Sequence, residues 1–343
     1  MNALPALAEK VETLWLTGSH SNDPIATAHS RFAPGHPRFC QTLKMPSGNE
    51  YSREWNELGL WLEKTHTHTS NRASYGPDPT SILARDETGM PEGSSVAAIV
   101  RSLLDTAVDD LAAAFGLAAG LGRLHPAGIP TLVRGAVELS GVGMWVLTGK
   151  GRGGRQERAL RVAHDSLFNA SKFFSHMAAD PGVPGDVQAD ARTSSEASKA
   201  QVDSLLGSAA FLGLRKSAVK APLNRSDALR QVDKERGTDF FSRWQLCSGF
   251  AHGFAWAPQF FNDLAYRHVM EGGGVLTGRV LSEERALVLL RWGRHSIEEF
   301  LGSLNIGLMP NKAGDQLSIV ASPSLQVHPL FSLKQPNQAP TKA

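Results

Sequence analysis

The stretch that decides the fold is Val96-Ala-Ala-Ile-Val-Arg-Ser-Leu-Leu-Asp-Thr-Ala-Val-Asp-Asp-Leu-Ala-Ala-Ala-Phe115. Its larger apolar side chains recur at intervals of three and four residues, whereas Arg101, Asp105 and Asp109 occupy another face. This interval matches the turn of an α-helix, so one side of the stretch is suited to burial. We therefore expect an amphipathic helix here and further helices packed against its apolar side.

The sequence that follows repeats this type of pattern. A second helix is expected from about Pro130 to a glycine-rich linker at 149–154, and it is apolar on nearly every side except at Arg134 and Glu138. Further helices are expected at about 155–177, from the Pro-Gly turn at 181–185 to about Leu206, from near Ser226, from Thr238, and from Ser282 to about Leu304. We predict an all-α bundle of about six or seven helices over residues 95–305.

Two segments of different character flank this bundle. Residues 1–94 are rich in proline and glycine, which predicts an irregular extension with short helices. Within it, residues 55–63 form a helical pattern whose tryptophans are expected to dock on the bundle. Residues 306–343 alternate apolar and polar residues, contain several prolines, and are expected to form a loose C-terminal tail.

Composition and charge indicate an ordinary globular protein. Hydrophobic residues make up 41% of the chain and charged residues 20%, and the net charge is only +2, so no strong nucleic-acid or membrane signature is present. The N-terminus lacks the basic region of a signal peptide. The two cysteines, Cys40 and Cys247, lie far apart, as is typical of a reducing compartment. We expect a cytoplasmic protein with no membrane association.

One candidate site rests on two helices with polar residues in apolar surroundings. In Arg243-Trp-Gln-Leu-Cys-Ser-Gly-Phe-Ala-His-Gly253, Trp244, Ser248 and His252 are four residues apart and share a helix face, as do Arg134 and Glu138. Buried charges need partners, so the two helices are expected to bring these groups together. His252, Arg134 and Glu138 are the candidate catalytic residues, and Trp244 and Ser248 are candidate binding residues. The alternative is a buried structural network without chemistry.

A basic run provides a second candidate surface. Lys150, Arg152, Arg155, Arg158 and Arg161 are spaced to contact a phosphate backbone, and the last three are the candidate RNA-binding residues. The alternative is that these residues are ordinary solvent-exposed charges at the start of a helix, since aromatic residues are scarce among them.

Two histidine patterns contain side chains that can act as metal ligands. They are His66 with His68, and His295 with Glu298 and Glu299. Neither supplies a matching second motif, so both are better explained by surface positions. No metal and no cofactor are expected.

The helices that carry Arg134-Gly-Ala-Val-Glu138 and Ser248-Gly-Phe-Ala-His252 resemble a family of helical proteins common in actinobacteria. More distantly, residues 95–305 resemble HEPN domains, the helical bundles of RNA-cleaving toxins and defence systems. That resemblance implies a bundle that binds RNA, a nucleotide or a protein. Active HEPN nucleases place a His five to seven positions after an Arg, a spacing that Arg31…His36 and Arg158…His164 match. On a regular helix, two side chains six residues apart point about 120° away from each other. The arginine and the histidine would therefore need a helix break or a dimer partner to meet at one phosphodiester.

Three functional interpretations follow from these features. The preferred one is a HEPN-like protein that binds RNA, a nucleotide or a protein partner, with catalysis left open. The second is a metal-independent ribonuclease in which histidine acts as acid and base while arginine stabilises the phosphorane charge. The third is a structural or interaction protein in which the same residues only fix helix register. A homodimer is a further alternative for the partner.

Overall fold

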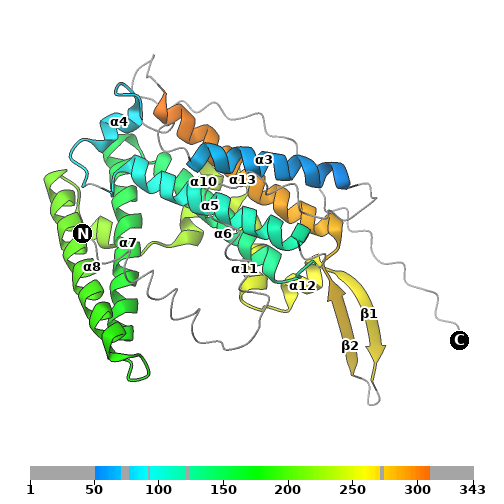
Figure 1. The fold of residues 1–343 in the computed structure, drawn as a ribbon. Coiled ribbons are helices and arrows are strands. Elements are labelled where there is room, and N and C mark those ends of the chain that lie inside the picture. Colours follow the sequence, from blue (N-terminus) through cyan, green and yellow to red (C-terminus); the bar gives the residue numbers. More distant parts are fainter. Residues whose placement is uncertain (1–50, 71–76, 92, 121–123, 271–273, 310–343) are drawn as a thin grey trace, which may run out of the picture.

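The computed structural model describes residues 51–70, 77–91, 93–120, 124–270 and 274–309. This part of the chain forms eleven helices and one two-stranded antiparallel sheet (Figure 1). In chain order the elements are α3 (Ser52–Ser70), α4 (Ile82–Glu87), α5 (Val96–Gly120), α6 (Gly128–Leu147), α7 (Gly151–Ala179), α8 (Gly185–Phe211), α9 (Lys216–Lys220), α10 (Arg225–Arg236), α11 (Phe240–Ala251), α12 (Trp256–Phe261), β1 (Asp263–Val269), β2 (Val275–Val280) and α13 (Glu283–Leu308).

The predicted helical character is confirmed, but the predicted number of six or seven helices is wrong. Three of the additional helices, α4, α9 and α12, have only five or six residues. Such helices make fewer than two turns, so no apolar periodicity can reveal them. A further helix, α3, lies within the segment that was expected to be mostly irregular.

Helix α6 forms the centre of the bundle, as its apolar sequence predicts. It packs against α5, α10, α11 and α13. Two of its glycines allow close approach: a Cβ added to Gly141 would lie 2.0 Å from Leu229, and one added to Gly143 would lie 2.1 Å from Phe300. The bundle is therefore packed so closely around α6 that these two positions have no room for a side chain.

Helix α3 belongs to the same core as the later helices. Trp55 is fully buried, and its indole Nε1 donates to Oε1 of Glu283 at the start of α13 (2.8 Å). The predicted docking of residues 55–63 through a tryptophan is confirmed. The predicted boundary at residue 94 is not marked by a break in this core, because Trp55 and Leu83 are in the same buried cluster as residues of α5 and α13.

Helices α7 and α8 form a long antiparallel pair on one side of the bundle (Figure 1). A small apolar cluster that includes Leu160, Leu205 and Val219 lies between them. Farther along, the pair is joined by serines, with Ser175 Oγ 2.7 Å from Ser195 Oγ. In this distal part of the pair, small polar side chains are buried beside the apolar Val187 and Ala191.

The two strands form a hairpin that projects beyond the helices (Figure 1), and the sequence analysis did not predict it. All seven residues of β1 are exposed. Tyr266 pairs with Gly278, and a Cβ added to this glycine would lie 2.0 Å from the tyrosine ring, so the ring lies directly over the glycine backbone. The hairpin leads directly into α13, whose N-cap is Ser282 as predicted.

None of the helices in the described ranges has the length and apolar character that a membrane crossing requires.

Candidate functional site

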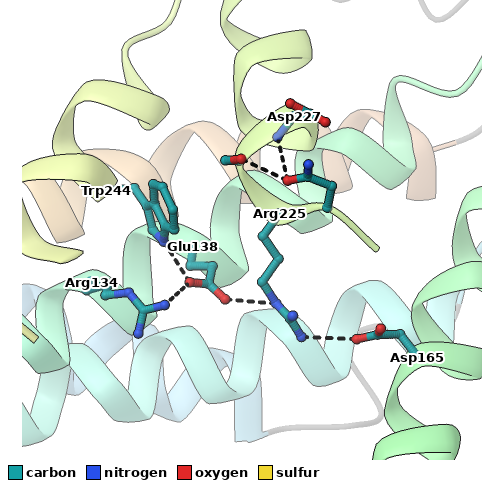
Figure 2. Close-up of polar contacts among 8 residues, drawn as sticks. Arg134, Glu138, Asp165, Arg225, Asp227 and Trp244 are labelled. Carbon is teal, nitrogen blue, oxygen red and sulfur yellow. Dashed lines mark hydrogen bonds and ion pairs between the residues drawn. The ribbon is translucent and has the colours of Figure 1, made fainter. Parts of the chain in front are cut away.

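The carboxylate of Glu138 is the centre of the polar cluster between the helices (Figure 2). Its Oε2 accepts a hydrogen bond from Trp244 Nε1 (2.7 Å) and lies 3.0 Å from Arg134 Nη2, while its Oε1 lies 2.9 Å from Arg225 Nε. Only 13% of the Glu138 side chain is exposed. Both carboxylate oxygens are thus occupied by nitrogen donors.

Four helices supply this cluster. Arg134 and Glu138 are one turn apart on α6, and Trp244 comes from α11, as the sequence analysis expected. Arg225 is the first residue of α10, and its Nη2 also reaches Asp165 on α7 (3.3 Å). Arg225 and Asp165 were not predicted, because no local spacing in the sequence links them to α6.

Arg225 is fixed in place by the start of its helix. The side chain of Asn224 caps α10 by accepting a hydrogen bond from the backbone N–H of Asp227 (3.3 Å). The helix expected from near Ser226 therefore begins one residue earlier. In the sequence, only the N-cap residue Asn224 could have indicated that Arg225 begins a helix.

A second carboxyl group lies close to this cluster. Asp110 on α5 is half-buried, and its Oδ2 is 2.0 Å from the position that a Cβ on Gly135 would occupy. Burial raises the pKa of Asp110, and the negative charges of Asp109 and Glu138 raise this pKa further. Gly135 has no side chain, and the carboxyl group of Asp110 occupies the space next to α6 that a side chain at this position would fill.

The other two residues predicted on the α11 face do not join the cluster. Ser248 is buried, whereas His252 is exposed and follows the last residue of the helix. The His252 ring lies 5.8 Å from the Phe254 ring. Within the described ranges, the hydrogen bonds and ion pairs of Glu138 involve Trp244, Arg134 and Arg225, and none of them involves His252.

The predicted basic surface is largely committed to contacts within the chain. Arg155 is buried and pairs with Asp86 through two hydrogen bonds of 2.5 and 3.0 Å. Arg158 Nη1 donates to the carbonyl oxygen of Trp145 (2.5 Å), and burial lowers its pKa. Arg161 donates to the carbonyl oxygens of Ala221 (2.9 Å) and Pro222 (2.5 Å). These three guanidinium groups fasten α7 to its neighbours.

The side chains of Arg158 and His164 make contacts with different parts of the chain. Arg158 points to the end of α6, whereas His164 is buried and stacks on Phe168 with ring centroids 5.8 Å apart. Burial, followed by the charge of Lys220, lowers the pKa of His164. Arg31 and His36, the other pair with this spacing, lie outside the described residues.

The histidines weighed as metal ligands lie next to single carboxylates. His66 Nδ1 is 3.5 Å from Asp109 Oδ1, and His295 Nε2 is 3.0 Å from Glu299 Oε1. In the described part of the chain, no three His, Cys, Asp or Glu residues are grouped so that they could hold a metal ion.

A separate groove of about 380 Å³ lies where α5 faces the end of α3. Its described lining residues are Thr69, Ala98, Arg101, Ser102, Leu104, Asp105, Thr106 and Asp109. This set includes none of the residues that the sequence analysis selected as a site.

Comparison with protein-family models, curated proteins and solved structures finds no match to this chain. The resemblance to HEPN domains stays a prediction from the sequence.

Proposed function

We propose that this chain is an interaction protein: a helical body, held in register by the cluster around Glu138, that presents an apolar surface to a protein partner. In this proposal the HEPN resemblance concerns the helical scaffold, and RNA cleavage is not part of the function. The buried, unpaired thiol of Cys247 suits the reducing cytoplasm, where we place the protein.

The observation that carries the proposal is the distribution of exposed apolar side chains. Sixteen large hydrophobic residues are exposed in the described part of the chain, and ten of them lie between Phe254 and Val280. Most of these ten belong to the β1–β2 hairpin, and the others lie in or just before α12 (Figure 1). Apolar side chains scattered over a surface need no explanation, but such a concentration at one end is typical of a protein interface.

The cluster around Glu138 supports a structural role for the residues first considered catalytic. Its carboxylate accepts from three donors that come from three helices, so each oxygen is already engaged within the chain. A partly buried carboxylate with this set of partners fixes the positions of α6, α10 and α11 relative to one another.

Site-specific photocrosslinking in the native cell tests the proposal. A photoreactive residue replaces either Tyr266 on the hairpin or Phe173 on α7, which are 55% and 59% exposed. We expect a discrete protein adduct from position 266 and none from position 173. No adduct from position 266, equal adducts from both positions, or an adduct with RNA would overturn the proposal.

A further inference from the structure

We infer that the hairpin binds a second copy of the chain, with the two copies related by a two-fold axis. This inference rests on the proposed function and names the partner of the same surface. One face of the hairpin, formed by Tyr266, His268, Met270, Leu276 and Val280, is here called the tyrosine face. The proposed interface consists of this face together with Phe254 and Trp256 at the base of the hairpin.

The strand register separates the two faces of the hairpin. Tyr266 pairs with Gly278 and His268 pairs with Leu276, so their side chains lie on one face, and Val280 shares it by the alternation along β2. On the opposite face, Arg267 pairs with Thr277 and Val269 pairs with Val275. We call this second face the arginine face.

The distribution of charge suits self-association through the tyrosine face. A two-fold axis places the same residues of two copies close together, so a charge near the axis would face its like. Arg267 and Arg279 both belong to the arginine face, and Arg279 Nη1 donates to the carbonyl oxygen of Asn262 in its own chain (2.9 Å). Asp263, at the base of the tyrosine face, has Arg285 of its own chain 3.9 Å away. In such a dimer, therefore, no arginine or carboxylate in the middle of the tyrosine face would contact the same residue of the second copy.

The exposed apolar area is sufficient for a stable dimer. Tyr266, Met270, Leu276 and Val280 are each about half exposed (48–55%), and Phe254 and Trp256 at the base of the hairpin are 54% and 44% exposed. Together these six residues expose on the order of 600 Å², if about 200 Å² is taken as the full surface of a large apolar residue. A standard interface buries about 800 Å² on each partner, of which somewhat more than half is non-polar. The apolar requirement of such an interface is thus met.

The hairpin itself also needs a partner for its stability. Two strands alone are at best marginally stable in water, and they become stable when further strands or a packed layer covers one face. Among the described residues, the Tyr266 ring lies over Gly278 on that face, while Leu276 and Val280 are about half exposed. A second hairpin packed against the tyrosine face supplies the missing layer.

Sedimentation equilibrium of the purified chain of residues 1–343 tests the inference. The pair of changes Tyr266→Asp and Leu276→Asp alters the tyrosine face, and the matched pair Val269→Asp and Val275→Asp places the same charges on the arginine face of the same strands. We expect the wild type and the arginine-face variant to be dimers at about 100 µM, and the tyrosine-face variant to be a monomer with a dissociation constant raised at least 100-fold. Far-UV circular dichroism establishes that all three chains are folded.

Three outcomes would overturn the inference. They are a monomeric wild type at the highest concentration, equal dissociation of both variants, and a monomer whose hairpin amides are protected from hydrogen exchange by residues 1–50. If the purified chain is monomeric but position 266 still crosslinks to a different protein in the cell, only the self-association fails. In that case the proposed interaction function stands.

Discussion

The indole Nε1 of Trp244 donates to Oε2 of Glu138 across 2.7 Å, and this hydrogen bond joins α11 to α6. The same carboxylate forms ion pairs with both Arg134 and Arg225. Replacement Glu138→Gln keeps the shape of the side chain but places an amide group among three nitrogen donors. Since the site is only partly buried, we expect the free energy of unfolding to fall by about 2 kcal/mol.

The variant Trp244→Phe provides the comparison for Glu138→Gln. It removes one hydrogen bond and keeps an aromatic ring in the same place, so the expected loss is about 1 kcal/mol. Urea unfolding measures both changes. A Glu138→Gln chain as stable as the wild type would show that the carboxylate does not hold the helices together.

Asp110 should make the stability of the protein depend on pH. Its pKa is raised in the folded chain because burial, Asp109 and Glu138 all disfavour the carboxylate. Its stabilising contribution is therefore fully present below the pKa of the unfolded chain and is lost as the pH rises through the folded pKa. Asp110→Asn should stabilise the protein at pH 7, by less than about 1 kcal/mol because the group is only partly buried and solvent screens it.

Unfolding in urea at a series of pH values tests this expectation. The advantage of Asp110→Asn should shrink as the pH is lowered toward the ordinary pKa of aspartate. Asp203→Asn on the exposed side of α8 is the control, and it should change stability little at any pH. An advantage for Asp110→Asn that grows in acid would contradict the assigned direction of the pKa shift.

The glycines of α6 should not accept alanine. In Gly143→Ala the new methyl group would lie 2.1 Å from the fully buried ring of Phe300, so the ring has to move. We expect a loss of about 1–3 kcal/mol in the free energy of unfolding. Gly207→Ala on α8 has no neighbour within 4 Å, and it should stabilise the protein by up to about 1 kcal/mol through helix propensity. Equal effects at the two positions would refute this account of the packing.

The thiol of Cys247 should be unreactive in the folded protein. Burial raises its pKa to about 12, so the thiolate that reacts with alkylating and disulfide reagents is scarce at pH 8. In a Cys40→Ser chain, we expect a thiol reagent to react with Cys247 only after urea unfolds the protein. Modification of the native chain at the rate seen in urea would mean that α11 opens readily.

The ribonuclease interpretation can be tested at His252. The wild type and His252→Ala should both cleave labelled RNA only at background level, because His252 is exposed and lies about 12 Å along the α11 direction from Trp244. RNA cleavage by the wild type that is lost in His252→Ala would restore the catalytic interpretation. Because Arg155, Arg158 and Arg161 are engaged within the chain, we also expect no steep salt-dependent binding of RNA.

Part of the polar cluster could be predicted from local spacing, and the rest could not. Arg134 and Glu138 are four residues apart within one helix, so their ion pair follows from the sequence. The same reasoning failed for the placement of His252 because the helix stops before it. Gly253 adopts a left-handed φ of 68°, the Phe254 N–H bonds to the Gly249 carbonyl, and this Schellman motif ends α11.

The hairpin shows a different limit of sequence reasoning. Its apolar residues face solvent, so the alternation along β1 and β2 does not mark a side that is buried within the chain. A run with Tyr266 and Val269 before the glycines and Val275 and Leu276 after them is nevertheless typical of two strands around a turn. The long helices were predictable because their periodicity reflects burial within the chain itself.

Trp55 has a practical consequence for anyone who shortens this protein. Its ring lies 5.7 Å from that of Phe115, and its indole is the hydrogen-bond donor to Glu283 in the first turn of α13. A truncation that starts at residue 95 would expose Phe115 to water and would promote aggregation. The minimal folding unit therefore extends upstream past Trp55.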